Sequence, residues 1–216
     1  MVFGKIEYLN LLPFHIFIKR FAPSHAKAIM EHKKGVPAKI NKAFVSRRVD
    51  AAFISSIAAQ KYSHLSLGII AKQEVQSVIV IPSNTQELDS ESATSNVLLH
   101  VMGLEGKVLI GDKALRYALK NDNYIDMAKL WYERYRLPFV FALLCFHKDK
   151  KLYQKIEKNF LKKEIKIPQY MLKKSAKRVG VSPKEAKEYL KLISYNLDAK
   201  AQRGLLKFYK EAKKVI

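Results

Sequence analysis

Small polar residues stand in this sequence where an apolar segment ends or a helical segment begins. These residues are Asn10 after GKIEYL, Ser55 and Ser56 after DAAFI, Ser77 after Glu74-Val75-Gln76, Ser92, Ala93, Thr94 and Ser95 before NVLLHVM, and Gly111 and Asp112 after KVLI. Open α/β sheets bind ligands at the carboxyl ends of their strands. The free N–H groups of a helix start, helped by Ser and Thr hydroxyls, suit a carboxylate or a phosphate. The pattern therefore predicts a site for a small anion.

Each of these residues also has a purely structural interpretation. Asn, Ser and Thr are common helix caps, so Asn10 and the segment ESATS are what a helix start requires by itself. Asp112 is placed to cap the turn before KALRYALK. Five such junctions in one small α/β chain nevertheless exceed what capping requires, which favours the anion site.

The segments that must position these residues alternate between short strands and helices, which indicates an α/β layer architecture. DAAFIS and SVIVIP are continuously apolar, as expected for strands covered on both faces. Strands are predicted at FGKIEYL, near KAIMEHK, at DAAFIS, near LSLGIIAK, at QSVIVIP, at KVLIG and at PFVFALLCF. Helices are predicted over residues 12–21, 37–48, 56–62, 94–102 and 126–136.

The region after residue 147 has a different character. Its Leu, Ile, Tyr and Phe residues recur at helical spacing with Lys between them, and Ser182-Pro183 with Glu185 is a typical helix start. Helical segments are predicted at KLYQKIEKNFLKKEI, QYMLKKSAKRVG, SPKEAKEYLKLISYNL and DAKAQRGLLKFYKEAKKV.

The 216-residue chain is long enough for one domain or two small lobes. Its 40 Lys and Arg against 19 Asp and Glu give a net charge of +21, and two thirds of that excess, +14, lies from His147 onward. No apolar run reaches the about 18 residues that would span a bilayer. The start MVFGKIEYLN lacks the pattern of a secretory signal, so a cytoplasmic location is expected.

Several kinds of site find no support in the residue pattern. The six histidines show no metal-binding spacing, so no metal site is predicted. Neither GxxxxGK[ST] nor GxGxxG is present, which argues against a nucleotide site. The single cysteine, Cys145, lies in the apolar run FVFALLCF and is expected to pack as a small hydrophobic residue.

Six segments in order carry a resemblance to a known family. GKIEYLNLLPF, VPAKINKAFVSRRVDAAFISSI, SVIVIPS, ESATSNVLL, VLIGDKALR and LPFVFALL look like the chorismate dehydratases, which act in the futalosine route to menaquinone. The resemblance implies a fold similar to type II periplasmic binding proteins, with two α/β lobes, a ligand cleft between them and additional C-terminal helices. It implies that residues 1–83 plus 138–216 form lobe one and residues 84–137 form lobe two, which is short because ELDS runs directly into ESATS.

The resemblance also implies the chemistry and the residues for it. A chorismate dehydratase removes the proton at carbon 3 and the hydroxyl at carbon 4 of chorismate, without a cofactor, and releases 3-[(1-carboxyvinyl)oxy]benzoate. The matched motifs place two residues in the reaction, Asn10 and Asp112. They place the substrate against Tyr8, Ser55, Ser56, Ser77, Ser92, Ala93, Thr94, Ser95 and Gly111.

The identity of the base stays open between two routes. Asp112 is the only acid in a motif at a strand end, and burial would raise its pKa. Alternatively the enolpyruvyl carboxylate of the substrate takes the proton itself, with the enzyme fixing the geometry. The second route is slightly preferred.

Two other functions remain as alternatives. A solute-binding protein on the same fold would capture an anion without transforming it, but capture outside the cell needs a signal for export. The Lys-rich tail would suit nucleic acid. Lysines between apolar residues also keep amphipathic helices soluble, so nucleic acid is the less favoured partner. Whether or not the tail binds nucleic acid, its positive charge would attract a dianion. The sequence leaves the oligomeric state open.

Overall fold

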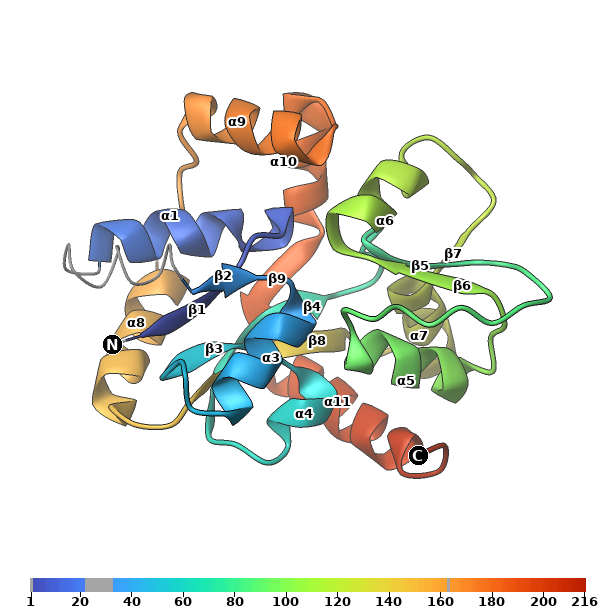
Figure 1. The fold of residues 1–216 in the computed structure, drawn as a ribbon, viewed down its shortest axis with the longest axis horizontal. Helices are drawn as coiled ribbons and strands as arrows, with labels where there is room; N and C mark the ends of the chain where they lie inside the picture. Colours follow the sequence, from blue (N-terminus) through green and yellow to red (C-terminus); the bar gives the residue numbers. More distant parts are fainter. Residues whose placement is uncertain (1, 22–32, 163) are drawn as a thin grey trace.

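Two β-sheets form the frame of the computed structural model, which describes residues 2–21, 33–162 and 164–216 (Figure 1). In these residues the larger sheet has six strands, in the order β2 (Lys34–Gly35), β1 (Phe3–Ile6), β3 (Ala51–Ser55), β8 (Phe139–Phe146), β4 (His64–Ala71) and β9 (Ile193–Asn196). The smaller sheet has the order β6 (Lys107–Ile110), β5 (Val78–Ile81) and β7 (Ile125–Asp126). β1 runs parallel to β2 and β3, whereas β8 runs antiparallel to both of its neighbours. The predicted α/β class is confirmed.

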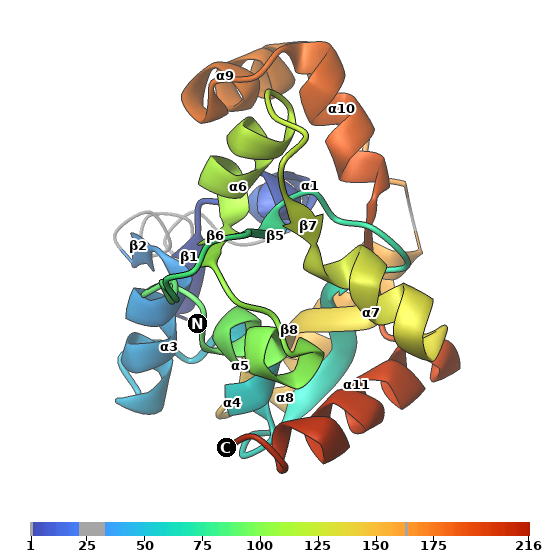
Figure 2. The same ribbon diagram turned by 90° about the vertical axis from the view of Figure 1, so that its right-hand side faces the viewer.

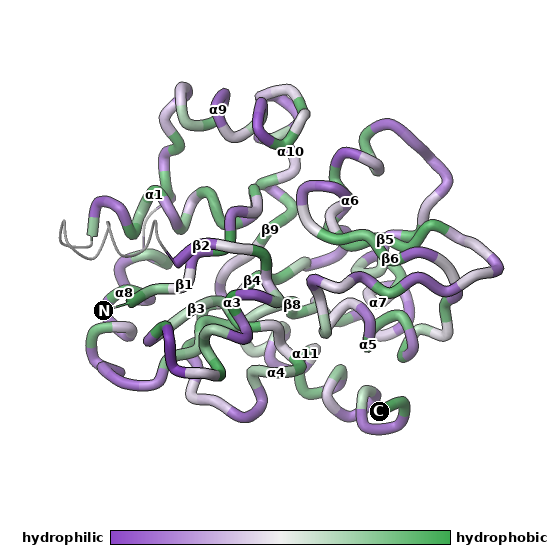
Figure 3. Tube along the Cα trace, in the orientation of Figure 1, coloured by the Kyte–Doolittle hydropathy of each residue, from purple (hydrophilic) through white to green (hydrophobic). Residues whose placement is uncertain are grey.

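Helices cover both faces of the larger sheet. The ring of Phe3 in β1 packs on Phe14 of α1 (Leu12–Phe21), and Phe14 in turn packs on Phe160 of α8 (Lys150–Leu161). The next residue, Gly4, points to the other face, where a Cβ would lie 2.8 Å from Ile40 of α3 (Pro37–Val45). This alternation is the period of two that a strand imposes, and Figure 3 shows how the strands concentrate the hydrophobic residues.

The smaller sheet is covered in the same way. α6 (Gly111–Ala118) lies on one side of it, and α5 (Ala93–Met102) and α7 (Met127–Tyr135) lie on the other (Figures 1 and 2). The short α4 (Ser56–Ala59) follows β3 and contacts α5. Before α5, Glu87 forms a single parallel bridge with Lys107, at the place where the sequence lacks a further apolar strand.

The C-terminal region joins the two parts. α9 (Gln169–Val179) and α10 (Pro183–Lys191) contact the 3-10 turn η1 (Leu9–Leu11) that follows β1, and α9 also contacts α6. α11 (Ala199–Ala212) packs on β8 and α5. The predicted start of α10 is confirmed, because Ser182 and Glu185 form a reciprocal capping box.

Some expectations need correction. The segment ISYN, expected to continue a helix, forms β9, because β4 offers it an open edge with which it pairs at Leu67 and Ile70. α6, β2 and β7 were not predicted from the sequence; the two strands are only two residues long. The strand expected near KAIMEHK lies mostly outside the described residues, and the lobe limits at 84 and 137 stay a prediction. No described helix is long and apolar enough to cross a membrane.

Candidate functional site

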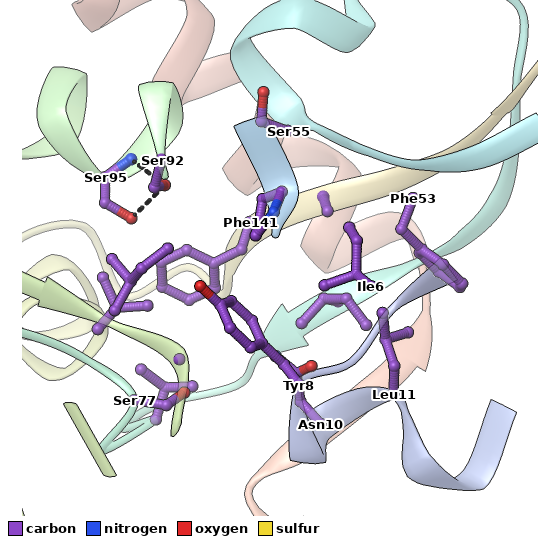
Figure 4. A pocket seen from close by; sticks show the side chains of 17 residues that line it. Ile6, Tyr8, Asn10, Leu11, Phe53, Ser55, Ser77, Ser92, Ser95 and Phe141 are labelled. Carbon is purple, nitrogen blue, oxygen red and sulfur yellow. Dashed lines mark hydrogen bonds between the residues drawn. The ribbon is translucent and has the colours of Figure 1, made fainter. Parts of the chain in front are cut away.

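A pocket lies between the two sheets (Figure 4). Its apolar walls come mainly from strands of both sheets, with Ile6, Phe53 and Phe141 from the larger and Val78 and Ile110 from the smaller. The predicted site residues that line it are Tyr8, Asn10, Ser55, Ser77, Ser92, Ser95 and Gly111. The structure thus brings together seven residues that the sequence scatters over more than 100 positions.

Two of the pocket serines accept hydrogen bonds from side chains behind them. Asn41 Nδ2 donates to Ser55 Oγ over 3.0 Å, and the Tyr189 hydroxyl donates to Ser77 Oγ over 2.8 Å. Neither serine hydroxyl donates to another group in the described part of the chain. Because a hydroxyl has one hydrogen, that hydrogen stays available for a ligand in the pocket.

Ser92 and Ser95 show the same arrangement at the start of α5. Ser92 is the helix cap, since its Oγ accepts from the Ser95 N–H over 3.1 Å. The Ser92 hydroxyl then donates to Ser95 Oγ over 2.8 Å, as the dashed lines in Figure 4 show. The capping interpretation of ESATS is therefore correct for Ser92, and it leaves the Ser95 hydroxyl hydrogen as a third donor for the pocket.

Helix starts converge on the same space. α3 begins at Pro37, α5 is capped by Ser92, and α6 begins at Gly111, and all three residues line the pocket. The N-terminal end of a helix carries partial positive charge and unpaired N–H groups. No Lys, Arg, His, Asp or Glu side chain is among the described residues of the pocket wall. Its polarity therefore comes from hydroxyls, one amide and helix ends.

Asn10 lies in the turn η1, which is held from two sides. The Leu9 N–H donates to Asp112 Oδ1 over 2.9 Å, and the Tyr195 hydroxyl donates to the Asn10 main-chain oxygen over 2.5 Å. The side-chain Oδ1 of Asn10 is buried and has no hydrogen-bond partner within the described residues. Buried polar atoms without a partner are rare, so this oxygen is an acceptor suited to a ligand hydroxyl.

Asp112 does not line the pocket. Its Oδ1 accepts from Leu9, and its Oδ2 forms an ion pair with the Arg178 guanidinium at 2.9 Å. Burial raises the pKa of Asp112, although the Leu9 N–H and the Arg178 charge act in the opposite direction. In this position the carboxyl group fixes the turn that carries Asn10.

Tyr8 connects the two sides of the pocket. Its ring lies flat against Gly111, where an added Cβ would come within 2.5 Å of the ring, and its hydroxyl donates to the Glu91 carboxylate. Burial, reinforced by Glu91, raises the pKa of Tyr8 far above its ordinary value, so the hydroxyl keeps its hydrogen. Lys113 pairs with Asp89 at 2.7 Å beside this contact.

Three predicted binding residues do not appear in the described pocket wall. Thr94 Oγ1 accepts the Ile57 N–H over 3.2 Å and lies 3.3 Å from Ser56 Oγ, so Thr94 and Ser56 join α4 to α5 behind the pocket. Ala93 is exposed. Their binding roles stay a prediction, because no ligand contact tests them.

Sequence reasoning missed the residues that orient the serines. Asn41 lies within the matched segment VPAKINKAFVSRRVDAAFISSI but was not singled out there, and Tyr189 lies in the Lys-rich tail, outside the six matched segments. Asp126 was also missed: its carboxylate caps α7 and accepts the N–H groups of Val75 and Gln76 at 2.9 and 2.6 Å, just before Ser77. A place within a matched segment is the signal that could have pointed to Asn41.

Other reactive groups lie away from the pocket. No three His, Cys, Asp or Glu side chains gather as a metal site in residues 2–21, 33–162 and 164–216. Cys145 is buried in β8, and burial raises the pKa of its thiol to about 12. That pKa argues against a thiolate nucleophile there.

Solved structures share the fold at low sequence identity. A protein of Archaeoglobus fulgidus aligns with a TM-score of 0.66 at 12% identity, over 98% of this chain and 96% of that one. The periplasmic aliphatic sulphonate binding protein SsuA of Escherichia coli aligns with a TM-score of 0.55 at 12% identity, over 100% of this chain and 92% of that one. The predicted likeness to periplasmic binding proteins is therefore confirmed for the fold.

Sequence comparison identifies the family. The menaquinone biosynthesis family matches residues 1–107 and 101–214. The chorismate dehydratase of Campylobacter jejuni is 46% identical over 99% of this chain and 98% of its own length, so the two chains have nearly the same length. The chorismate dehydratase of Thermus thermophilus is 26% identical over 96% of this chain and 93% of its own length. The chain therefore belongs to the menaquinone biosynthesis family and, within it, to the chorismate dehydratases.

Proposed function

We propose that the pocket between the two sheets is where this chorismate dehydratase binds chorismate and converts it to 3-[(1-carboxyvinyl)oxy]benzoate and water. The observation that carries the proposal is the orientation of Ser55, Ser77 and Ser95. Each accepts a hydrogen bond from the protein and keeps its own hydrogen for the pocket. Chorismate has two carboxylates, which are acceptors only, so three hydroxyl donors suit it.

The electrostatic setting supports the same substrate. The starts of α3, α5 and α6 meet at the pocket and favour negative charge there. The walls around them are largely apolar, and a hydrogen bond to a carboxylate is stronger in apolar surroundings than in water. Phe53 and Phe141 are among the lining residues, and aromatic side chains suit a six-membered ring that becomes aromatic.

The serine donors also suit the transition state. Loss of the proton at carbon 3 sends negative charge into the ring carboxylate, so donors on that carboxylate bind more strongly as the reaction advances. Removing one donor of this kind typically costs about 2.7–4 kcal/mol of transition-state stabilisation. The proposal assigns this role to Ser77 and Ser95.

Asn10 is suited to the hydroxyl that leaves. Its Oδ1 has no partner in the described residues and can accept a hydrogen bond from the carbon 4 hydroxyl. That bond would orient the carbon–oxygen bond for elimination. Asn10 thus keeps the role in the reaction that the motif implies, as an orienting acceptor.

The base is assigned to the substrate. The described pocket wall has no carboxylate or imidazole, and both oxygens of Asp112 are bonded to Leu9 and Arg178. The enolpyruvyl carboxylate takes the proton from carbon 3, the carbon–oxygen bond at carbon 4 breaks, and the same proton leaves with the hydroxyl as water. Asp112 as the base is the alternative.

Turnover of chorismate tests the proposal. The purified protein is incubated with chorismate, and products are followed by chromatography and mass. We expect loss of one water at a rate above the protein-free control, abolished by a bulky substitution in the pocket such as Ser95→Phe. Full activity of Ser95→Phe would place the reaction elsewhere.

The alternatives have less support. The sulphonate binding protein shares the fold at 12% identity, whereas the enzyme relative is 46% identical over nearly the whole chain. The net charge of +21 would attract a dianionic substrate as well as nucleic acid. A cytoplasmic location, the absence of a cofactor and chorismate as the only ligand stay predictions.

A further inference from the structure

The hydroxyl of Tyr189 reaches the pocket wall from the C-terminal region. Tyr189 is 3% exposed, lies in α10, and donates to Ser77 Oγ across 112 sequence positions. The side chain of Asn10 also lies close enough to interact with this hydroxyl. One hydroxyl therefore contacts two pocket residues, one following β1 of the larger sheet and one preceding β5 of the smaller.

The direction of the hydrogen bond from Tyr189 to Ser77 determines where the hydrogen of the Ser77 hydroxyl can point. Tyr189 uses its only hydrogen on Ser77, so the Ser77 oxygen is occupied and the Ser77 hydrogen must point elsewhere. Ser77 lines the pocket, and its hydroxyl donates to no other described group. Burial raises the pKa of Tyr189 far above its ordinary value, which keeps this hydrogen in place at working pH.

Both partners are held rigidly. A capping box starts α10, and the strand β9 that follows it pairs with β4. On the other side, the Ser77 main-chain oxygen accepts the Gly111 N–H over 2.7 Å. A donor and an acceptor that are both fixed hold the serine in one rotamer, which is the requirement for a preorganised site.

We propose that Tyr189 is a positioning residue for the dehydration: its hydroxyl turns the Ser77 hydroxyl toward the substrate carboxylate. The proposal rests on the proposed function, because it requires Ser77 to contact the substrate. The Lys-rich tail would then contribute to the active site through the Tyr189 hydroxyl as well as through its positive charge.

A double-mutant cycle of Tyr189→Phe and Ser77→Ala tests the proposal. Tyr189→Phe removes the hydroxyl and keeps the ring, so we expect kcat for chorismate to fall about tenfold, as for loss of one hydrogen bond, with KM within about threefold. On the Ser77→Ala background the same change should lower kcat by less than about twofold, because its target is gone.

Tyr209→Phe is the matched control. The Tyr209 hydroxyl donates to the Ser56 main-chain oxygen over 2.9 Å and to no side chain of the described pocket wall, so its loss should leave kcat unchanged. Thermal unfolding of each variant shows that the fold is kept. If turnover of a variant is too slow to measure, the same double-mutant cycle is carried out with the affinity for the product, measured by calorimetry.

Three results would overturn the proposal. Tyr189→Phe with unchanged kcat would show that the hydroxyl only packs. Equal losses on both backgrounds would show that Tyr189 acts independently of Ser77. Full activity of Ser77→Ala would show that the Ser77 hydroxyl plays no part in turnover, so Tyr189 could not act through it. Failure of the proposed function can be distinguished from failure of the Tyr189 proposal, because in the first case the unchanged protein would not convert chorismate at all.

Discussion

Asp112 and Gly111 are neighbours in one motif, yet the structure gives them different tasks. Asp112 fixes Leu9 and pairs with Arg178, whereas Gly111 provides the flat surface under Tyr8. A strand end followed by Gly-Asp predicts a ligand site from sequence, and Gly111 does line the pocket. The sequence could not show that the Asp112 carboxylate points behind the turn, because Leu9 and Arg178 come from distant segments.

Replacing Asp112 by Asn tests its role. The amide oxygen still accepts the Leu9 N–H, but the residue can no longer take a proton. We expect turnover of chorismate to stay within about tenfold of the unchanged protein, because a positioning contact is weakened and no base is lost. Steady-state kinetics measure this. A loss of about 10²–10⁴-fold with product affinity intact would instead identify Asp112 as the general base.

Replacing Gly111 by Ala tests the contact with Tyr8. The backbone at Gly111 has a φ of +61°, and the new Cβ would lie 2.5 Å from the Tyr8 ring. Gly103 is a matched control, because its φ is +65° and nothing lies within 4 Å of an added Cβ. Both variants should lose about 1 kcal/mol or more of unfolding free energy from backbone strain. Only Gly111→Ala should also raise KM, and equal KM values for the two variants would contradict the contact.

Among the elements, the loop before β5 shows how the fold prepares a site residue. Asp126 lies at the end of β7, caps α7 through the Ala128 and Lys129 N–H groups, and also accepts two N–H groups from residues 75 and 76. Ser77 follows immediately. A single carboxylate therefore ties the loop, the smaller sheet and a helix together.

Asp126→Asn should destabilise the protein by about 1.5–3 kcal/mol, the range for hydrogen bonds to a charged group. The amide keeps one oxygen but places an NH₂ group against N–H donors. Chemical denaturation measures the change, with Asp122→Asn as the control because Asp122 is exposed in the preceding loop. Equal stability of the two variants would contradict the proposed role of the carboxylate.

The end of α11 predicts a pH dependence. Hydrogen bonds from Lys207 and Lys214 lower the pKa of Glu211 to about 2. A lowered pKa means that the ionised form is favoured in the folded state, so Glu211 stabilises the protein above its unfolded pKa near 4.5 and loses this effect as the pH falls toward 2.

Glu211→Gln should therefore unfold at a lower temperature than the unchanged protein at pH 6, and the difference should shrink as the pH falls below about 4.5. Thermal unfolding across this range measures it. Glu133→Gln, an exposed position on α7, is the control. A difference that stays constant with pH would contradict the ion-pair explanation.

For the whole molecule, local patterns predicted most of the fold. Continuously apolar runs such as DAAFIS and FVFALLCF became buried central strands, and caps such as Ser182 marked helix starts. What could not be predicted depends on contacts distant in sequence. β9 is a strand only because β4 offers an edge, and the Tyr189 hydroxyl reaches Ser77 only because α10 contacts the turn η1 that follows β1.

The same distinction applies to the candidate site. Seven of the eleven predicted residues line one pocket, because strand ends and helix starts of the two sheets meet there. Thr94 and Ser56 have the same local signals and lie behind the pocket, where they bond to each other's helices. Residue type and position at a junction therefore predict the region of the site but not which way each hydroxyl points.

In the proposed mechanism, serine hydroxyls of this pocket stabilise the substrate carboxylate as the reaction advances. The most direct measurement is kcat for chorismate dehydration by Ser77→Ala beside Ser83→Ala, an exposed serine in the loop after β5. We expect kcat to fall about 10²–10³-fold in Ser77→Ala, the effect of removing one such donor, and to stay unchanged in Ser83→Ala. Equal activity of the two variants would contradict it.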